Sequence, residues 1–185
     1  MSERSGRRAH KYLEKMGVEI TLNTMIKSYN GKTAKLSTGK SISTETLIWA
    51  AGVKGALVKG FPDKSIEKGK LMVNQFSQVL KNKEKGDIYE NIFAVGDIAC
   101  MKTEKYKNGH PGLAQAAIQQ GKTLARNLNR MKKGKPRKGF HYKNKGVLAT
   151  VGRNKALAEL PGNINVYGTA GWFVWMIVHL LFLVI

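Results

Sequence analysis

The residues of this chain best suited to ligand chemistry lie between Ile92 and Gly121. Asp97 follows Gly96 at the end of the apolar run IFAV, and a glycine there lets the backbone approach a ligand closely. Ligands of open α/β sheets bind beyond the carboxyl ends of the strands. The Asp97 carboxylate is therefore placed to accept hydrogen bonds from the hydroxyls of a ligand.

Two glutamines follow in the segment PGLAQAAIQQG, which predicts a helix with Pro111 in its first turn. Gln115 and Gln119 are four residues apart and share one face of that helix. A helix N-terminus favours negative charge, so the strand end and the helix start together suit a ligand with sugar-like hydroxyls and an electron-rich ring. The side of the helix that packs is predicted to carry Leu113, Ala117, Leu124 and Leu128.

Hydrophobic patterning predicts the strands and helices that position these residues, in an α/β arrangement. Asn30-Gly31 marks a hairpin, and the basic segment Lys132–Lys145, with Gly134, Pro136 and Gly139, is expected to be a mobile linker. The expected elements are an amphipathic helix over Ser2–Met16, strands over Val18–Leu22, Ser41–Ala50, Leu71–Val79, Ile92–Val95 and Gly146–Val151, a buried run over Leu47–Ala51, and a helix from Pro111 to about Met131.

Several segments together resemble the C-terminal part of type II, non-proton-pumping NADH:quinone oxidoreductases, which are two-dinucleotide-binding-domain flavoproteins. The resemblance rests on TLIWAAGVKG, FAVGD, AQAAIQQG and GVLATVGRNKALA, in the family's order, followed by the apolar tail AGWFVWMIVHLLFLVI. It implies a partial doubly wound dinucleotide-binding fold with a C-terminal membrane-associated helical segment. Residues 1–52 would end the NADH domain, residues 53–131 would be the second segment of the FAD domain, and residues 132–185 would be a membrane-association region.

The resemblance also implies FAD as cofactor, NADH as substrate and quinone as electron acceptor. It implies that Gly96 and Asp97 bind FAD hydroxyls and that Ala114 and Gln115 lie at the flavin. Gln115 and Gln119 match the A-Q-x-A-x-Q pattern of the quinone pocket. Arg153 would lie near the flavin, and Ala51 and Gly52 would pass close to nicotinamide and flavin. No catalytic residue is identified, because the family's acidic residue would lie upstream of this sequence.

Plainer interpretations of these residues stay open. Either glutamine is also compatible with an ordinary exposed helix position, and an arginine after a glycine is common in basic proteins. Ala51 and Gly52 are also compatible with the simple end of a strand.

The net charge of +20 predicts an anionic partner. Nucleic acid, an anionic membrane surface and acidic cofactors are all compatible with it, and so is a solvated basic surface. The apolar tail favours a membrane, and no helix-turn-helix, zinc or RNP-like pattern supports nucleic acid. Cys100 is the single cysteine, so neither a disulfide framework nor a thiol redox pair is possible, and no metal site is expected.

Residues 166–185 carry no charged side chain apart from the titratable His179. Trp172, Phe173 and Trp175 lie where interfacial aromatic residues are found. A helix lying in one leaflet is the preferred interpretation, followed by a spanning helix and then a buried core helix. The resemblance adds a homodimer on the cytoplasmic face of the bacterial inner membrane, and His179 receives no catalytic role.

Neither of the family's two G-x-G-x-x-G loops occurs in the sequence, which we therefore interpret as a C-terminal fragment that is inactive alone. Two alternatives remain: a membrane-bound, non-catalytic interaction fragment, or another flavin-dependent pyridine-nucleotide oxidoreductase of the same superfamily. The choice of quinone and the preference between NADH and NADPH stay open.

Overall fold

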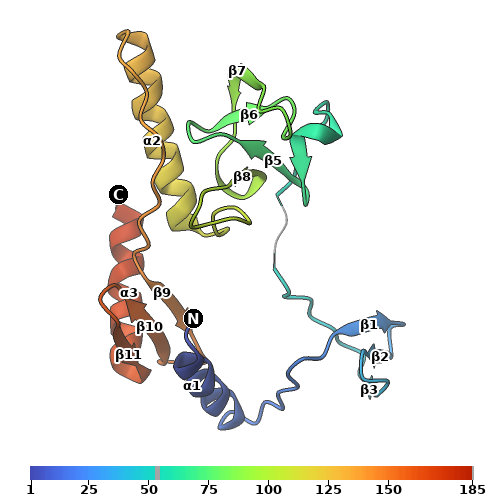
Figure 1. Cartoon of the computed structure of the whole chain (residues 1–185). Helices are drawn as coiled ribbons and strands as arrows, with labels where there is room; N and C mark the ends of the chain where they lie inside the picture. The colour runs from blue at the N-terminus through green and yellow to red at the C-terminus, as the bar shows by residue number, and fades with distance from the viewer. Residues whose placement is uncertain (53–54, 185) are drawn as a thin grey trace. The chain divides into compact units, whose positions relative to one another are not determined.

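A computed structural model describes residues 1–52 and 55–184, with the side chains of 182–184 left out of the description. Val53 and Lys54 of the TLIWAAGVKG segment and Ile185 of the tail lie outside these residues. The chain forms two compact units, one built from Met1–Ala51 with Lys145–Ile185 and the other from Gly52–Asn144 (Figure 1). Each unit is described by itself.

The unit Gly52–Asn144 is built on a five-stranded sheet whose strands run in the order β4-β5-β6-β7, with β8 added beside β5. Only the β5–β8 pair is parallel among the described strands, and the other pairs are antiparallel. The expected α/β class is confirmed as a mixed α/β fold, in which this sheet is mostly antiparallel. The strands are β4 Ile66–Glu67, β5 Lys70–Val73, β6 Gln78–Leu80, β7 Ile88–Phe93 and β8 Ala99–Met101, with short 3-10 turns η1 Asp63–Ser65 and η2 Gly96–Ile98.

The single strand predicted over Leu71–Val79 is wrong, because the chain reverses between β5 and β6. The Asn74 side-chain oxygen accepts the backbone N–H groups of Phe76 and Gln78, and Ser77 adopts a left-handed φ of 66°. Side-chain bonds of this kind stabilise a turn against continued strand. The strand predicted over Ile92–Val95 is also displaced, since β7 starts at Ile88 and ends at Phe93.

Helix α2, Ala114–Lys132, belongs to this unit and buries two amide side chains as well as an alanine. Its buried residues are Ala116, Gln120 and Asn127, whereas Leu128 of the predicted packing side is 45% exposed. Pro111 precedes the N-cap Leu113 and lies before the helix, not in its first turn. The buried hydrophobic core of the unit consists of Leu71, Val73, Val79, Ala94, Ala99, Met101 and Phe140.

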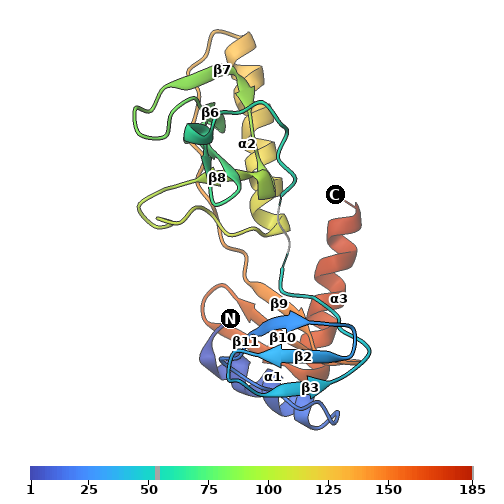
Figure 2. The same cartoon turned by 90° about the vertical axis from the view of Figure 1, so that its right-hand side faces the viewer.

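The predicted mobile linker is wrong for residues 135–143, which we call the strap and which run back along α2 in both views (Figures 1 and 2). The Asn127 amide donates to Lys138 O at 2.8 Å and accepts Lys138 N–H at 2.9 Å. Phe140 is 4% exposed, and its N–H donates to Gln75 O. Side-chain amides that bond the backbone therefore hold an irregular segment in place, although it carries no periodic pattern.

The other unit contains a three-stranded antiparallel sheet in the order β11-β10-β9. Its strands are β9 Val147–Thr150, β10 Ala156–Leu160 and β11 Ile164–Tyr167, so the strand predicted over Gly146–Val151 is confirmed. Residues 156–158 of the central strand are at most 1% exposed. Successive strand residues point to opposite faces, so both faces of β10 are covered.

Helix α1, Glu3–Glu14, covers one face of this sheet and confirms the predicted N-terminal helix. Ser2 caps it, and both the backbone N–H and the hydroxyl of Ser2 donate to the Glu159 carboxylate at 2.6 Å. These hydrogen bonds lower the pKa of Glu159 to about 2, and the bond from the Ser2 hydroxyl has the largest effect. Arg8 lies 4.6 Å from the Tyr167 ring centroid, which adds a cation–π contact.

Helix α3, Gly168–Val184, packs against the same sheet, where a Cβ on Gly171 would lie 2.7 Å from Ala156 O. The close approach therefore depends on glycine. Phe173 is 50% exposed and Ile177 53% exposed, so α3 is not a fully buried core helix. No helix among the described residues is long and apolar enough to cross a membrane.

A small antiparallel meander, β1 Ile26–Tyr29, β2 Thr33–Leu36 and β3 Ser41–Ser43, confirms the hairpin at Asn30-Gly31. The strand predicted over Val18–Leu22 does not form, and β3 ends seven residues before Ala50. The run Leu47–Ala51 is not buried either, since Ile48 is 83% exposed. Strands need hydrogen-bonded neighbours, and neither segment has one among the described residues.

Candidate functional site

The candidate site is built around Asp97, which lies in the turn η2 directly after β7. Its side chain is exposed, and no described residue hydrogen-bonds its carboxylate. Gly96 precedes it with a φ of 74°, a left-handed conformation that costs other residues roughly 1–2 kcal/mol. The turn therefore presents an acceptor group to an incoming donor.

Three glycines lie in or beside this turn at positions where a side chain would be crowded. A Cβ on Gly55 would lie 2.8 Å from Ile98 Cγ2 and 3.0 Å from Asp97 O. A Cβ on Gly112 would lie 3.2 Å from an Asp97 carboxylate oxygen, and one on Gly96 would lie 3.3 Å from Ala117 Cβ. Backbone thus lines the surroundings of Asp97, as expected where an extended ligand lies against the chain.

The N-terminus of α2 adjoins this turn. Its N-cap, Leu113, makes no side-chain capping bond, and the first turn carries no acidic residue. The dipole of a helix whose N-cap side chain makes no capping bond favours a ligand atom with negative charge. Ala114 is the first residue of the helix, so the structure brings it to the same region as Gly112 and Asp97.

Gln119, the second predicted amide, is engaged by the strap. Its Nε2 donates to Lys143 O at 2.9 Å, and its Oε1 accepts Lys143 N–H at 3.0 Å. Gln115 lies one turn earlier on α2 and is half-buried. The strap uses the Gln119 oxygen and one of its two N–H groups, which leaves the second N–H as a donor for a ligand.

Three predicted site residues lie apart from the turn in sequence and are exposed. Ala51 and Gly52 are at the junction of the two units, and Arg153 is in the turn between β9 and β10. Trp172, Phe173 and Trp175 are on α3, with the first two rings 5.2 Å apart. The Trp175 ring lies 4.3 Å from that of His179, whose Nδ1 is 2.8 Å from Trp175 O.

The sequence analysis missed Gln120 and His110. Gln120 is 3% exposed and accepts the Gly96 N–H at 2.7 Å. His110 lies in an aromatic cluster with Tyr106, Phe140 and Tyr142, at ring separations of 4.6 to 5.7 Å. Burial lowers the pKa of His110 and raises that of Tyr142, and neither the His110 ring nitrogens nor the Tyr142 hydroxyl has a partner among the described residues.

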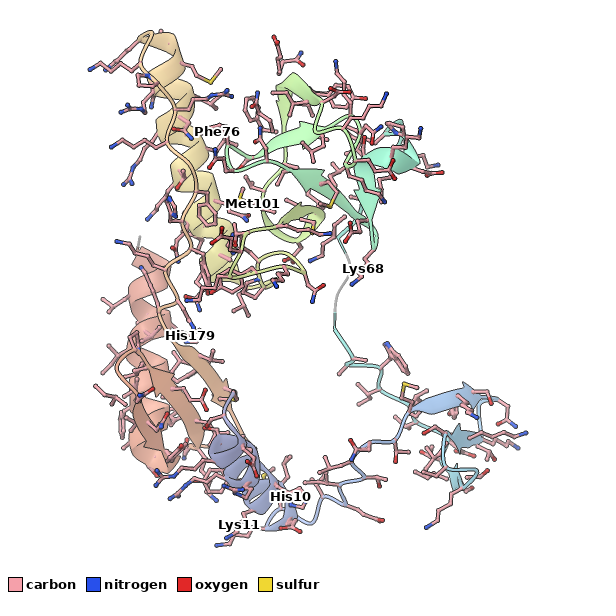
Figure 3. All side chains as sticks on the ribbon, viewed as in Figure 1. His10, Lys11, Lys68, Phe76, Met101 and His179 are labelled. Carbon is pink, nitrogen blue, oxygen red and sulfur yellow. The ribbon has the colours of Figure 1, made fainter. Side chains whose placement is uncertain are left out.

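The segment that contains α2 and the strap is basic, since no Asp or Glu occurs between Glu104 and Glu159. The half-buried Arg137 guanidinium lies 4.5 Å from the Phe76 ring centroid and donates to Gln78 Oε1 (Phe76 and the core residue Met101 are labelled in Figure 3). Among the described residues, no group of His, Cys, Asp and Glu could hold a metal ion. Cys100 is 6% exposed, and burial raises the pKa of its thiol, as suits a packing residue.

A strand-end carboxylate beside a helix N-terminus is typical of a dinucleotide site. Residues 1–121 match the family model described as pyridine nucleotide-disulphide oxidoreductase, and the chain belongs to that family.

Its relatives include type II NADH:quinone oxidoreductases, which confirms the resemblance drawn from sequence. NdhA of Mycobacterium tuberculosis is 32% identical over 197 residues, covering 100% of this chain and 39% of that protein. The Haemophilus influenzae enzyme is 34% identical over 154 residues, covering 83% of this chain and 33% of that protein. The chain thus spans less than half the length of these relatives.

A solved structure shares the fold. NDH2 from Plasmodium falciparum in complex with NADH matches with a TM-score of 0.78 over 98% of this chain and 51% of that one. The sequence identity is 16%, so this likeness concerns the fold alone.

Proposed function

We propose that this chain is the C-terminal part of a type II NADH:quinone oxidoreductase, which passes electrons from NADH through FAD to a membrane quinone without pumping protons. The observation that carries the proposal is the Asp97 turn, where an exposed carboxylate lies beside the start of α2 and three glycines let the backbone pack closely. The relatives named above support the reaction assigned to it.

The Asp97 surroundings fit FAD by their chemistry. The carboxylate offers hydrogen-bond acceptors to the hydroxyls of a ribityl chain, and no described residue competes for them. The N–H of Ala114 and the α2 dipole suit the electron-rich edge of the isoalloxazine. When bound, FAD would accept hydride and release electrons, whereas the protein positions it and sets the local charge.

Gln115 and Gln119 are proposed to bind quinone. An amide N–H donates readily to a quinone carbonyl. Lys143 of the strap bonds the Gln119 Oε1 and one of its two amide N–H groups, so the second N–H can donate to a quinone carbonyl while the strap stays bound. Arg153, Ala51 and Gly52 are proposed to complete the surroundings of the flavin and nicotinamide.

Membrane association is proposed through residues 166–185. The exposed apolar side chains of α3 support a helix lying in one leaflet. Trp172 and Trp175 suit the interfacial region, where aromatic rings are enriched. The protein would then be a homodimer on the cytoplasmic face of the bacterial inner membrane. We also propose the domain partition 1–52, 53–131 and 132–185.

Flavin content tests the proposal. The longest polypeptide that carries this sequence is purified as wild type, as Asp97→Ala and as Asp87→Ala, which removes another exposed carboxylate of the same unit. We expect non-covalent FAD in the wild type and in Asp87→Ala, and a loss of FAD in Asp97→Ala. A wild type without flavin would refute the function, and full flavin in Asp97→Ala would refute the role of Asp97.

A further inference from the structure

Gln120 places a polar amide where helix α2 faces the core of its unit. The side chain is 3% exposed, and its Oε1 accepts the Gly96 N–H at 2.7 Å. A buried amide is unfavourable unless it is hydrogen-bonded, so an apolar side chain would suit packing alone better. The bond to Gly96 therefore accounts for the polarity of this position.

The group that Gln120 holds is the N–H of the Val95–Gly96 peptide, one peptide before Asp97. Gly96 adopts a φ of 74° and lies against the Ala117 methyl group, one helical turn from Gln120. Gly55 and Gly112 close on the turn from other parts of the chain. Of these contacts, the hydrogen bond that Gly96 N–H donates to Gln120 is the one directional interaction with α2, and it orients the turn relative to the start of that helix.

We propose that Gln120 is a positioning residue that fixes the Asp97 carboxylate for binding FAD, an inference that rests on the function proposed above. Gln120 acts through Gly96 and does not contact the ligand. The two adjacent glutamines have different partners, because the Gln119 amide bonds the strap whereas the Gln120 amide bonds Gly96 in the turn that carries Asp97.

Three variants distinguish a role in positioning the Asp97 turn from a general effect on the folding stability of the protein. Gln120→Met keeps the length of the side chain and removes the acceptor. Gln120→Glu keeps an oxygen that accepts the Gly96 N–H in either protonation state. The matched control is Asn127→Leu, since Asn127 is also buried on α2, at 2% exposure, but bonds Lys138 of the strap.

The readout is the dissociation constant of FAD, measured by quenching of flavin fluorescence in the longest polypeptide that carries the sequence. Loss of the bond leaves a backbone N–H unsatisfied and frees the turn, so we expect about tenfold weaker FAD binding in Gln120→Met. Gln120→Glu should stay within about threefold of the wild type, since its acceptor is retained. Asn127→Leu should bind FAD as the wild type does, even where its thermal midpoint falls.

A double-mutant cycle tests whether Gln120 acts through Asp97. In the Asp97→Ala background the carboxylate is absent, so the further effect of Gln120→Met should nearly vanish. Additive effects would overturn the inference, as would wild-type affinity in Gln120→Met or an equal loss in Asn127→Leu. If Gln120→Met does not fold, the FAD affinity of Gln120→Glu tests the inference instead, and about tenfold weaker FAD binding by Gln120→Glu overturns it. A wild type that binds no FAD would refute the proposed function instead.

Discussion

Replacing Asn127 by leucine should release the middle of the strap from α2. Asn127 is 2% exposed, and its amide makes two hydrogen bonds with the backbone of Lys138. Leucine is similar in size and offers neither donor nor acceptor. Phe140 would still anchor the end of the strap in the core, so the expected change is local.

The size of the effect follows from the two bonds. Each contributes about 0.5–1.5 kcal/mol net, which gives about 1–3 kcal/mol for the pair. If the strap opens without unfolding the unit, the Lys138 amide should exchange with deuterium about 5- to 150-fold faster. Asn127→Asp should have a smaller effect, because its oxygen can still accept the Lys138 N–H.

The assay is amide hydrogen exchange, followed by mass spectrometry on peptides that cover residues 133–143. Asn129→Leu makes the same chemical change at an exposed position of α2 and should leave exchange unchanged. Equal exchange at Lys138 in Asn127→Leu and Asn129→Leu would show that the amide pair does not hold the strap.

Three further predictions concern the pH response, the acceptor site and the membrane. The pKa of Glu159 is lowered from 4.5 to about 2, so its ionised form stabilises the docking of α1 fully above the higher value, and this stabilisation is lost as pH falls toward the lower one. Amide exchange of α1 between pH 5 and about 2 should show the loss in the wild type and not in Glu159→Gln. Gln115→Leu and Gln119→Leu should lower quinone reduction several-fold more than ferricyanide reduction, and equal losses with both acceptors would contradict a quinone role. Truncation before Gly171 should release the protein from membranes. A wash with about 1 M salt should release it only in part, since salt screens charges and leaves apolar contacts intact. Complete release by salt would mean that charge alone holds the protein on the membrane.

Local signals in the sequence predicted several elements well. The helix over Ser2–Met16 has a serine cap and an amphipathic pattern, and it forms as Glu3–Glu14. Asn30-Gly31 marked the hairpin correctly, and the helix predicted to end near Met131 ends at Lys132. Each of these features depends on residues close together in the chain.

Features that depend on distant partners were missed. The apolar run Leu47–Ala51 predicted burial, but burial also requires a neighbouring surface. The strap has no periodicity, and its order comes from amides on α2 that the sequence does not distinguish from exposed ones.

In the candidate site too, residues that are adjacent in sequence could be predicted, and contacts between distant residues could not. Gly96 and Asp97 are adjacent, so the sequence could indicate them, and the structure presents the carboxylate at the end of β7 as expected. The approach of Gly55 and Gly112 to Asp97 joins residues more than ten positions apart. The bond from Gln120 to Gly96 spans 24 residues, so no local pattern could have predicted it.

The docking of α1 has a consequence for synthesis of the chain. The hydrogen bonds from Ser2 to Glu159 join residues 157 positions apart, with the whole of the other unit between them. Translation at about 5–20 residues per second would delay this contact by roughly 8–30 s after α1 emerges from the ribosome. During that interval Tyr12 and Leu13 of the nascent helix have no sheet to cover them. The unit Gly52–Asn144 is a continuous segment and can pack as soon as it is synthesised, so α1, which is made before this unit, docks on its sheet after the unit has folded.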